Sequence, residues 1–151
     1  MATEAERVER LHQLLMELVR LIVMRHPDPA AGEQSISLSQ TFALHELDTG
    51  TPLSQQELAD RLGLEKSSVS RLAAELERRG LLVRERVPSN RRVYRLRLTE
   101  QGKAAHRQRG AAFHEQYLRW TEAMTPAELD ALITGLAAFV RVATADRSAG
   151  S

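Results

Sequence analysis

Apolar positions divide the chain into segments with the period of a helix and segments with the period of a strand. From Val8 to Ile22 they recur at spacings of three and four, which predicts one long helix over residues 4–26. Pro27 is expected to end that helix, because proline disfavours helical geometry in the residue before it. A second helix is expected to begin at Ser37, which has capping-box spacing to a glutamine.

Two shorter helices follow, with a glycine-containing turn between them. Ser54 and Glu57 have the spacing of a second capping box, and the helix that they open is expected to stop at Gly63. The next helix is predicted over about residues 65–79, with Gly80 as its stop. A capped helix, a tight turn and a second helix together predict a helix-turn-helix.

The apolar period then changes from helical to alternating. Residues 82–87 and 93–98 alternate as strands do, on either side of a polar loop over residues 88–92. This pattern predicts a β-hairpin with a basic tip. Thr99 is expected to cap a following helix that ends near Glu122.

The C-terminal helix has the clearest start signal in the chain. Thr125 combines capping-box spacing with a proline at the first helical position. The helix is expected to continue to about residue 145, and residues 146–151 are expected to form a frayed tail. The complete order is mainly α (α+β): four helices, a hairpin and two more helices, with a winged helix-turn-helix in the middle.

The formal net charge of +1 hides a strongly basic segment. Between Lys66 and Arg97 there are ten basic and three acidic residues, so the segment carries +7 and the rest of the chain −6. A basic segment in an acidic body is typical of a face that binds a polyanion. The basic residues are Lys66, Arg71, Arg78, Arg79, Arg84, Arg86, Arg91, Arg92, Arg95 and Arg97.

Double-stranded DNA is the polyanion that this segment is expected to bind. Small hydroxylated residues near the start of the second helix allow close approach to base edges, and Arg71 can offer a bidentate fork to guanine. The hairpin arginines lie where a wing can enter the minor groove, whose negative potential attracts arginine. The serines have an alternative role as helix caps. The predicted DNA-binding residues are Ser54, Gln55, Lys66, Ser67, Ser68, Ser70, Arg71, Asn90, Arg91 and Arg92.

Several runs in this region closely resemble MarR regulators. They are Leu58-Ala59-x-x-Leu62-Gly63, Val69-x-x-Leu72, Leu76-Glu77-Arg78-Arg79-Gly80-Leu81-Leu82, Asn90-Arg91-Arg92 and Leu96-x-Leu98-Thr99-x-x-Gly102. The resemblance implies one MarR-type domain over residues 1–151. Its DNA-binding lobe would span about residues 37–100, and its dimerisation helices about residues 4–26 and 101–145. It also implies a transcriptional regulator, expected to be a repressor, that binds a palindromic operator as a homodimer, and the lack of a signal-peptide region predicts a cytoplasmic protein.

One residue departs from the pattern of the resembled family. The wing motif of that family is Asp-x-Arg, which assigns the minor-groove contact to Arg92, but its acidic position is Asn90 here. An amide can still accept a hydrogen bond and hold a turn, yet it cannot form an ion pair with Arg92. The wing is therefore expected to be more mobile or more basic than in relatives.

The terminal helices carry apolar faces too wide for one small protomer to cover. An isologous dimer interface would bury them and match a palindromic operator. The alternative is that these residues pack within the protomer. The predicted interface residues are Leu11, Leu15, Leu18, Ile22, Leu132, Leu136, Phe139 and Val140.

The resemblance further implies a small aromatic or phenolic effector, bound between the dimer helices and the DNA-binding lobe. An ordinary core or interface role is the alternative for each candidate residue. The candidates are His12, Met16, Phe42, His45, Phe113 and Tyr117.

Other functional classes lose support from what the sequence lacks. With no cysteine, disulfides, thiolate metal sites and thiol redox sensing are excluded. No apolar run approaches a membrane span, and the charged N-terminus lacks a signal-peptide region.

There is no phosphate-binding glycine loop or nucleophile elbow, so neither an enzyme nor a cofactor is expected. His106 and His114 are too far apart on one helix to hold one metal ion, so no metal site is predicted, although one assembled from distant segments stays open. The rival function is a winged-helix scaffold that binds protein rather than DNA.

Overall fold

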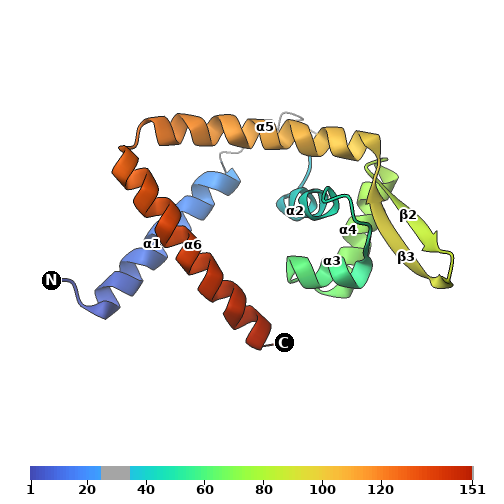
Figure 1. The fold of residues 1–151 in the computed structure, drawn as a ribbon, viewed down its shortest axis with the longest axis horizontal. Coiled ribbons are helices and arrows are strands. Elements are labelled where there is room, and N and C mark those ends of the chain that lie inside the picture. Colours follow the sequence, from blue (N-terminus) through green and yellow to red (C-terminus); the bar gives the residue numbers. More distant parts are fainter. Residues whose placement is uncertain (25–34, 151) are drawn as a thin grey trace. The chain divides into compact units, whose positions relative to one another are not determined.

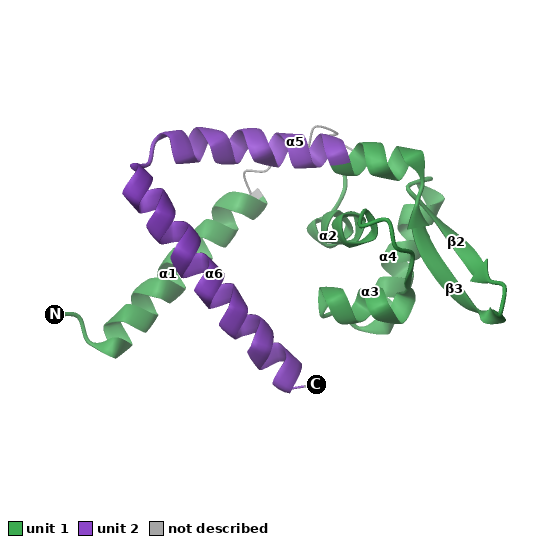
Figure 2. Cartoon of the chain, in the orientation of Figure 1, with its two compact units in different colours: residues 1–106 green, residues 107–151 purple. Residues whose placement is uncertain are grey.

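The computed structural model describes residues 1–24 and 35–150, and it has the expected mainly helical architecture with a small antiparallel sheet (Figure 1). In chain order the elements are α1 (Glu4–Met24), α2 (Leu38–Leu47), β1 (Leu53–Ser54), α3 (Gln55–Leu62), α4 (Lys66–Arg78), β2 (Leu82–Val87), β3 (Asn90–Leu98), α5 (Glu100–Glu122) and α6 (Pro126–Ala149). The chain divides into two compact units, residues 1–106 and 107–151 (Figure 2). The predicted winged helix-turn-helix lies in the first unit.

All three predicted capping boxes are present. The side chains of Ser37, Ser54 and Thr125 each accept a hydrogen bond from the backbone three residues on, and the side chain at that position bonds back to the cap. These reciprocal bonds satisfy N–H groups that a helix leaves without partners at its start. Gly63 ends α3 with φ of 65°, a left-handed conformation that glycine adopts without steric cost.

The sheet has the order β1-β3-β2, with both pairings antiparallel. Its hairpin differs from the prediction, because β3 begins at Asn90 and only Pro88 and Ser89 form the turn. The predicted five-residue loop was therefore too long. The sequence analysis also missed β1, a two-residue strand in which Leu53 pairs with Leu96. Two residues are too few to show an alternating pattern.

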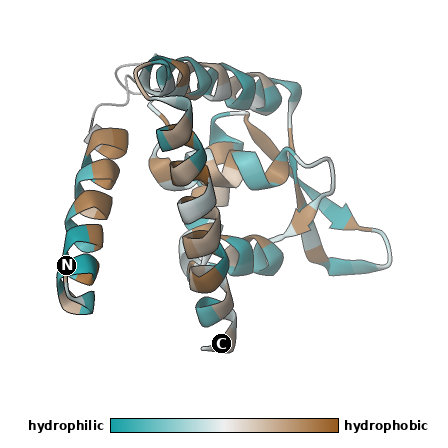
Figure 3. Cartoon of the chain, turned by 60° about the vertical axis from the view of Figure 1, so that its left-hand side comes forward, coloured by the Kyte–Doolittle hydropathy of each residue, from teal (hydrophilic) through white to brown (hydrophobic). Residues whose placement is uncertain are grey.

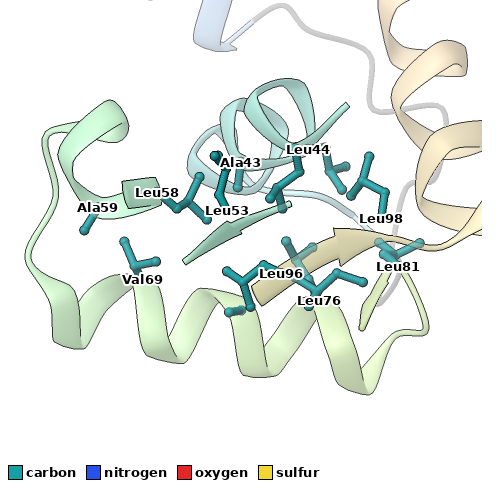
Figure 4. Packing of buried hydrophobic residues seen from close by; sticks show 13 residues of the cluster. Ala43, Leu44, Leu53, Leu58, Ala59, Val69, Leu76, Leu81, Leu96 and Leu98 are labelled. Atoms are coloured by element: carbon teal, nitrogen blue, oxygen red, sulfur yellow. The ribbon is translucent and has the colours of Figure 1, made fainter. Parts of the chain in front are cut away.

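Helices and sheet of the winged helix enclose one apolar core (Figure 4). α2, α3 and α4 each contribute an inward face, and the strands supply leucines from the other side. Because Val69 and Leu76 are fully buried, the face of α4 opposite them is fixed outward. The core residues are Ala43, Leu44, Leu47, Leu53, Leu58, Ala59, Val69, Ala73, Leu76, Leu81, Leu82, Leu96 and Leu98.

The terminal helices α1 and α6 differ from this lobe in having no fully buried residue in the described structure. Hydrophobic residues recur along both of them (Figure 3). α6 continues to Ala149, so the predicted frayed tail was wrong from residue 146 to residue 149, where no residue breaks the helix. The predicted end of the first helix, at residues 25 and 26 and the prolines after them, lies outside the described residues. None of the described helices is long and apolar enough to cross a membrane.

Candidate nucleic-acid interface

The N-terminal half of α4 presents its polar side chains on the surface. Lys66, Ser67 and Arg71 are exposed, while Ser68 and Ser70 are half-buried beside the core. The Arg71 Nε atom lies 3.5 Å from the Ser67 carbonyl oxygen, which keeps this side chain close to the helix surface. One exposed helical face thus combines hydroxyl groups with a guanidinium, the groups by which a helix contacts base edges and phosphates in the major groove.

Ser54 has a structural role in addition to its predicted place at the interface. Its hydroxyl accepts a hydrogen bond from the Glu57 N–H at 3.1 Å, and its own N–H donates to Glu57 Oε2 at 2.7 Å. That backbone hydrogen bond is the main reason why the pKa of Glu57 lies below its ordinary value, and the charge of Arg95 adds to it. Gln55, the first residue of α3, is half-buried. Contact of Ser54 or Gln55 with DNA stays a prediction.

Ion pairs neutralise part of the basic segment. Four of its arginines contact glutamates: Arg78 with Glu75 at 2.6 Å, Arg84 with Glu77 at 3.2 Å, Arg95 with Glu57 at 2.8 Å, and Arg97 with Glu85. Hydrogen bonds from the arginines are the largest cause holding the pKa of Glu75 and that of Glu85 below the ordinary range. A fifth arginine, Arg79, donates to the Ser35 carbonyl oxygen at 2.9 Å. These arginines have partners inside the protein.

Five basic residues form no ion pair with any acid in the described parts of the chain: Lys66, Arg71, Arg86, Arg91 and Arg92. We call them the unneutralised cations. Lys66 and Arg71 lie on the exposed face of α4, and the other three lie on the outer half of the β2–β3 hairpin, which we call the wing. The positive charge of the segment is therefore concentrated at two places, as a surface that attracts phosphates requires.

The tip of the wing has a definite geometry around Asn90. Val87 pairs with Asn90 and Arg86 with Tyr94, so the register shifts and the intervening residues of β3 have no partner across the ladder. Arg91 and Arg92 are in this bulge, and both are exposed. The Asn90 Oδ1 atom accepts a hydrogen bond from the Arg92 backbone N–H at 3.1 Å. Asn90 therefore makes the local hydrogen bond expected of an amide at this position.

The sequence analysis did not identify one contact in the wing, that between Arg86 and Tyr94. The Arg86 guanidinium carbon lies 5.3 Å from the centroid of the Tyr94 ring, directly across the two strands. The strand pattern placed both residues in the hairpin, but the register that opposes them depends on the bulge. An exposed arginine held over an aromatic ring is already ordered before any ligand arrives.

A chain of polar contacts joins α2 to the first turns of α5. His45 Nδ1 lies 3.3 Å from His106 Nε2, and His106 Nδ1 lies 2.7 Å from Asp48 Oδ2. The three side chains form a row in which both ring nitrogens of His106 are occupied. They do not converge on one point, and the described residues contain no group of three or more ligating side chains that could hold a metal ion. Sequence spacing could not reveal this row, because His45 and His106 are far apart in the chain.

The predicted effector residues lie on several helices. His12 and Met16 are exposed on α1, and Phe42, on α2, has 53% of its surface exposed. On α5 the centroids of the Phe113 and Tyr117 rings are 6.1 Å apart, and the ring planes are tilted by 30°. His45 takes part in the contact with His106 described above. The effector pocket stays a prediction.

The predicted dimer residues are largely exposed in the single chain. On α1, Leu11 and Leu18 are 42% and 38% exposed, and Leu15 and Ile22 are half-buried. On α6 the exposure is 48% for Leu132, 45% for Leu136, 44% for Phe139 and 53% for Val140. The dimer interface stays a prediction, and packing within the protomer stays its alternative.

Comparison with known proteins agrees with the winged-helix geometry. Residues 34–93 match the model of the MarR family. The structure of Rv1404 from Mycobacterium tuberculosis is 28% identical, with a TM-score of 0.76 over 95% of this chain and 97% of the other. The transcriptional repressor CouR, solved bound to a 23-mer DNA duplex, is 26% identical, with a TM-score of 0.71 over 93% of this chain and 99% of the other. FabT from Streptococcus pneumoniae, solved in complex with DNA, shares the fold at 18% identity, with a TM-score of 0.80 over 91% and 97%.

Proposed function

We propose that the chain, whose residues 34–93 match the MarR family model, is a winged-helix transcriptional regulator of this type that binds a palindromic operator in double-stranded DNA as a homodimer. The observation that carries this proposal is the distribution of the unneutralised cations. They lie on the exposed face of α4 and on the wing, whereas other arginines of the basic segment contact glutamates. A cytoplasmic location is part of the proposal, since a bacterial chromosome lies in the cytoplasm.

Each part of the interface has its own role. α4 enters the major groove, where Arg71 contacts a base edge and Ser67, Ser68 and Ser70 contact base edges or phosphates. The wing enters the adjacent minor groove, and Arg92 is the side chain that reaches into it. Asn90 supports that contact by holding the Arg92 backbone through its 3.1 Å hydrogen bond. Lys66 and Arg91 supply charge to phosphates.

Dimerisation through the terminal helices completes this function. The exposed apolar residues of α6 support it, because a surface of that composition is stabilised when a second copy covers it. A two-fold axis presents two copies of α4 to two half-sites about one helical turn apart. One domain over residues 1–151 then combines the DNA-binding lobe with the dimer helices.

Repression and its release by a small molecule belong to the same proposal. A dimer seated on an operator blocks access to the promoter, and an aromatic or phenolic effector between the dimer helices and the DNA-binding lobe would change the spacing of the two α4 helices. The candidate contacts are the six effector residues named above. The test measures operator binding while a panel of phenolic compounds is added. A compound that releases the wild type from the operator should release Phe113→Ala less readily.

Selection of bound sequences from random duplex DNA, followed by titration at several salt concentrations, tests the proposal directly. We expect a two-fold symmetric motif and a steep fall of affinity with salt, because protein cations displace counterions from phosphates. The rival function, a winged-helix scaffold that binds protein, predicts neither a selected motif nor a steep salt slope. If neither the selected motif nor the salt slope is observed, the proposal of a DNA-binding regulator is refuted.

A further inference from the structure

The wing holds one cation in a fixed position before DNA arrives. Arg86 on β2 and Tyr94 on β3 are directly opposite in the ladder, with the guanidinium carbon 5.3 Å from the ring centroid. Both residues are exposed, and Arg86 has no acidic partner in the described residues. An ion pair would neutralise this charge, whereas an aromatic face orders the guanidinium and leaves its charge available.

Strand alternation places this pair on the side of the sheet that faces α4. Arg84, two residues before Arg86, shares its face, and it donates to the Ser70 carbonyl oxygen of α4 at 3.3 Å. Across the ladder, Tyr94 shares its face with the fully buried Leu96. The inner part of this face packs on the core, and the pair continues the same face outward beyond it.

Arg97 lies on the opposite face of the same hairpin. It pairs with Val83 in the ladder, and its guanidinium contacts Glu85. The hairpin therefore has a neutralised arginine on one face and a charged, ring-supported arginine on the face toward α4. This contrast gives the two sides of the wing different electrostatic roles.

We propose that Arg86, positioned by Tyr94, binds the phosphate backbone that separates the groove entered by α4 from the groove entered by the wing tip. The inference rests on the proposed function. A sugar–phosphate strand lies between adjacent major and minor grooves, so a winged helix that occupies both grooves must cross it. The α4 side of the wing, inward of Arg91 and Arg92, faces that strand. A guanidinium matches phosphate geometry with two parallel hydrogen bonds.

This role differs from that of α4 and of the wing tip. A phosphate contact fixes the register of the protein on the duplex and carries no sequence information. Loss of Arg86 should therefore weaken binding to every duplex by a similar factor. Tyr94 acts as a positioning residue, because its ring orders the guanidinium without contacting DNA.

The test compares Arg86→Ala with Arg97→Ala in the full-length protein. Both variants remove one positive charge from the same hairpin, so they are matched in net charge. Arg86→Ala should weaken operator and scrambled duplex alike, roughly tenfold at low salt, and should reduce the salt slope by about one unit per protomer. Arg97→Ala should have a much smaller effect on both quantities. Thermal unfolding of each variant verifies that the wing remains folded.

Tyr94 variants test the positioning role separately. Tyr94→Phe keeps the ring and should bind DNA as the wild type does, whereas Tyr94→Leu should lose part of the affinity. Adding Arg86→Ala to Tyr94→Leu should lower the affinity by less than Arg86→Ala does in the wild type. If the wild type binds DNA but Arg86→Ala and Arg97→Ala change its affinity and salt slope equally, the role of Arg86 is overturned while the proposed function stands. A loss confined to the preferred operator would also overturn it, because that result indicates a base contact. A wild type without salt-dependent duplex binding would instead refute the proposed function.

Discussion

Gly102 lies against Leu81 so closely that a Cβ atom at residue 102 would be 1.9 Å from the Leu81 carbonyl oxygen. The contact joins the first turn of α5 to the turn between α4 and β2. Thr99 reinforces it, because its hydroxyl donates to the Gly80 carbonyl oxygen at 2.6 Å and accepts from the Gly102 N–H at 3.0 Å. The Thr99-x-x-Gly102 pattern noted in the sequence thus has a steric cause.

Gly102→Ala should destabilise the protein by about 1–3 kcal/mol or more, because the clash is with backbone and cannot be relieved by a side-chain rotation. Chemical denaturation measures this change. Gly110→Ala is the matched control: residue 110 is in the same helix, and beyond that helix's own backbone no atom of the described residues lies within 4 Å of its added Cβ. It should be neutral or stabilising by about 0.5–1 kcal/mol. Equal stability of the two variants would contradict the steric explanation.

Arg71→Ala should weaken binding to the preferred operator by about 1–3 kcal/mol if the guanidinium reads a base with two hydrogen bonds. Binding to scrambled duplex should change much less, because the lost contact is specific to sequence. Fluorescence anisotropy on both duplexes measures the difference. Equal losses on the two would assign Arg71 to a phosphate.

Arg92→Ala should lower affinity most for operators with A·T-rich flanks, since a narrow minor groove attracts arginine most strongly. Asn90→Asp should strengthen operator binding and slightly weaken non-specific binding. An aspartate can keep the hydrogen bond to the Arg92 N–H and make it charge-assisted, while its negative charge repels phosphate in general. Titrations of both variants at two salt concentrations decide this. If Arg92→Ala leaves every affinity unchanged, the wing does not contact DNA.

Leu136→Glu should shift the protein from dimer to monomer, raising the dissociation constant by more than about tenfold, because a charge would be buried at the interface without a partner. Sedimentation velocity across a range of concentrations measures this. Leu64→Glu is the control: Leu64, in the turn between α3 and α4, is 38% exposed but lies outside the terminal helices. A Leu136→Glu dimer as tight as that of the wild type would exclude α6 from the interface.

Glu57→Gln should make stability less sensitive to acid. The Ser54 backbone hydrogen bond lowers the pKa of Glu57 in the folded state, so its stabilising effect is complete above the unfolded pKa and is lost as the pH falls through the lower folded pKa. The variant should therefore unfold at a lower temperature than the wild type near neutral pH, and this gap should narrow between about pH 5 and pH 3. Glu115→Gln, on the exposed surface of α5, should follow the wild type throughout. A gap that does not depend on pH would contradict the linkage.

Local signals account for the parts of the fold that were predicted correctly. A capping box, a left-handed glycine and a period of three to four residues each act within a few positions, so Ser54, Gly63 and Thr125 marked helix ends without knowledge of the rest. The errors arose where local signals were weak. Residues 146–148 are polar, but neither they nor Ala149 stop the helix.

Contacts between distant segments were decided by the tertiary structure alone. β1 exists because Leu53 pairs with Leu96, a partner supplied by another part of the chain. The approach of His45 to His106 likewise depends on how α2 packs against the start of α5. No spacing in the sequence encodes these distances.

The sequence by itself determined that a winged helix-turn-helix would carry a basic face, since helix caps, apolar periods and charge are properties of neighbouring residues. Tertiary structure decided which of the basic residues remain available to a ligand. Ion pairing depends on distances between side chains that folding brings together, so Arg97 is neutralised by Glu85 while Arg86 is supported by Tyr94. The two arginines lie on opposite faces of the hairpin, and the register of the β2–β3 ladder gives each a different neighbour: Tyr94 is directly opposite Arg86, whereas Arg97 is opposite Val83 and reaches Glu85.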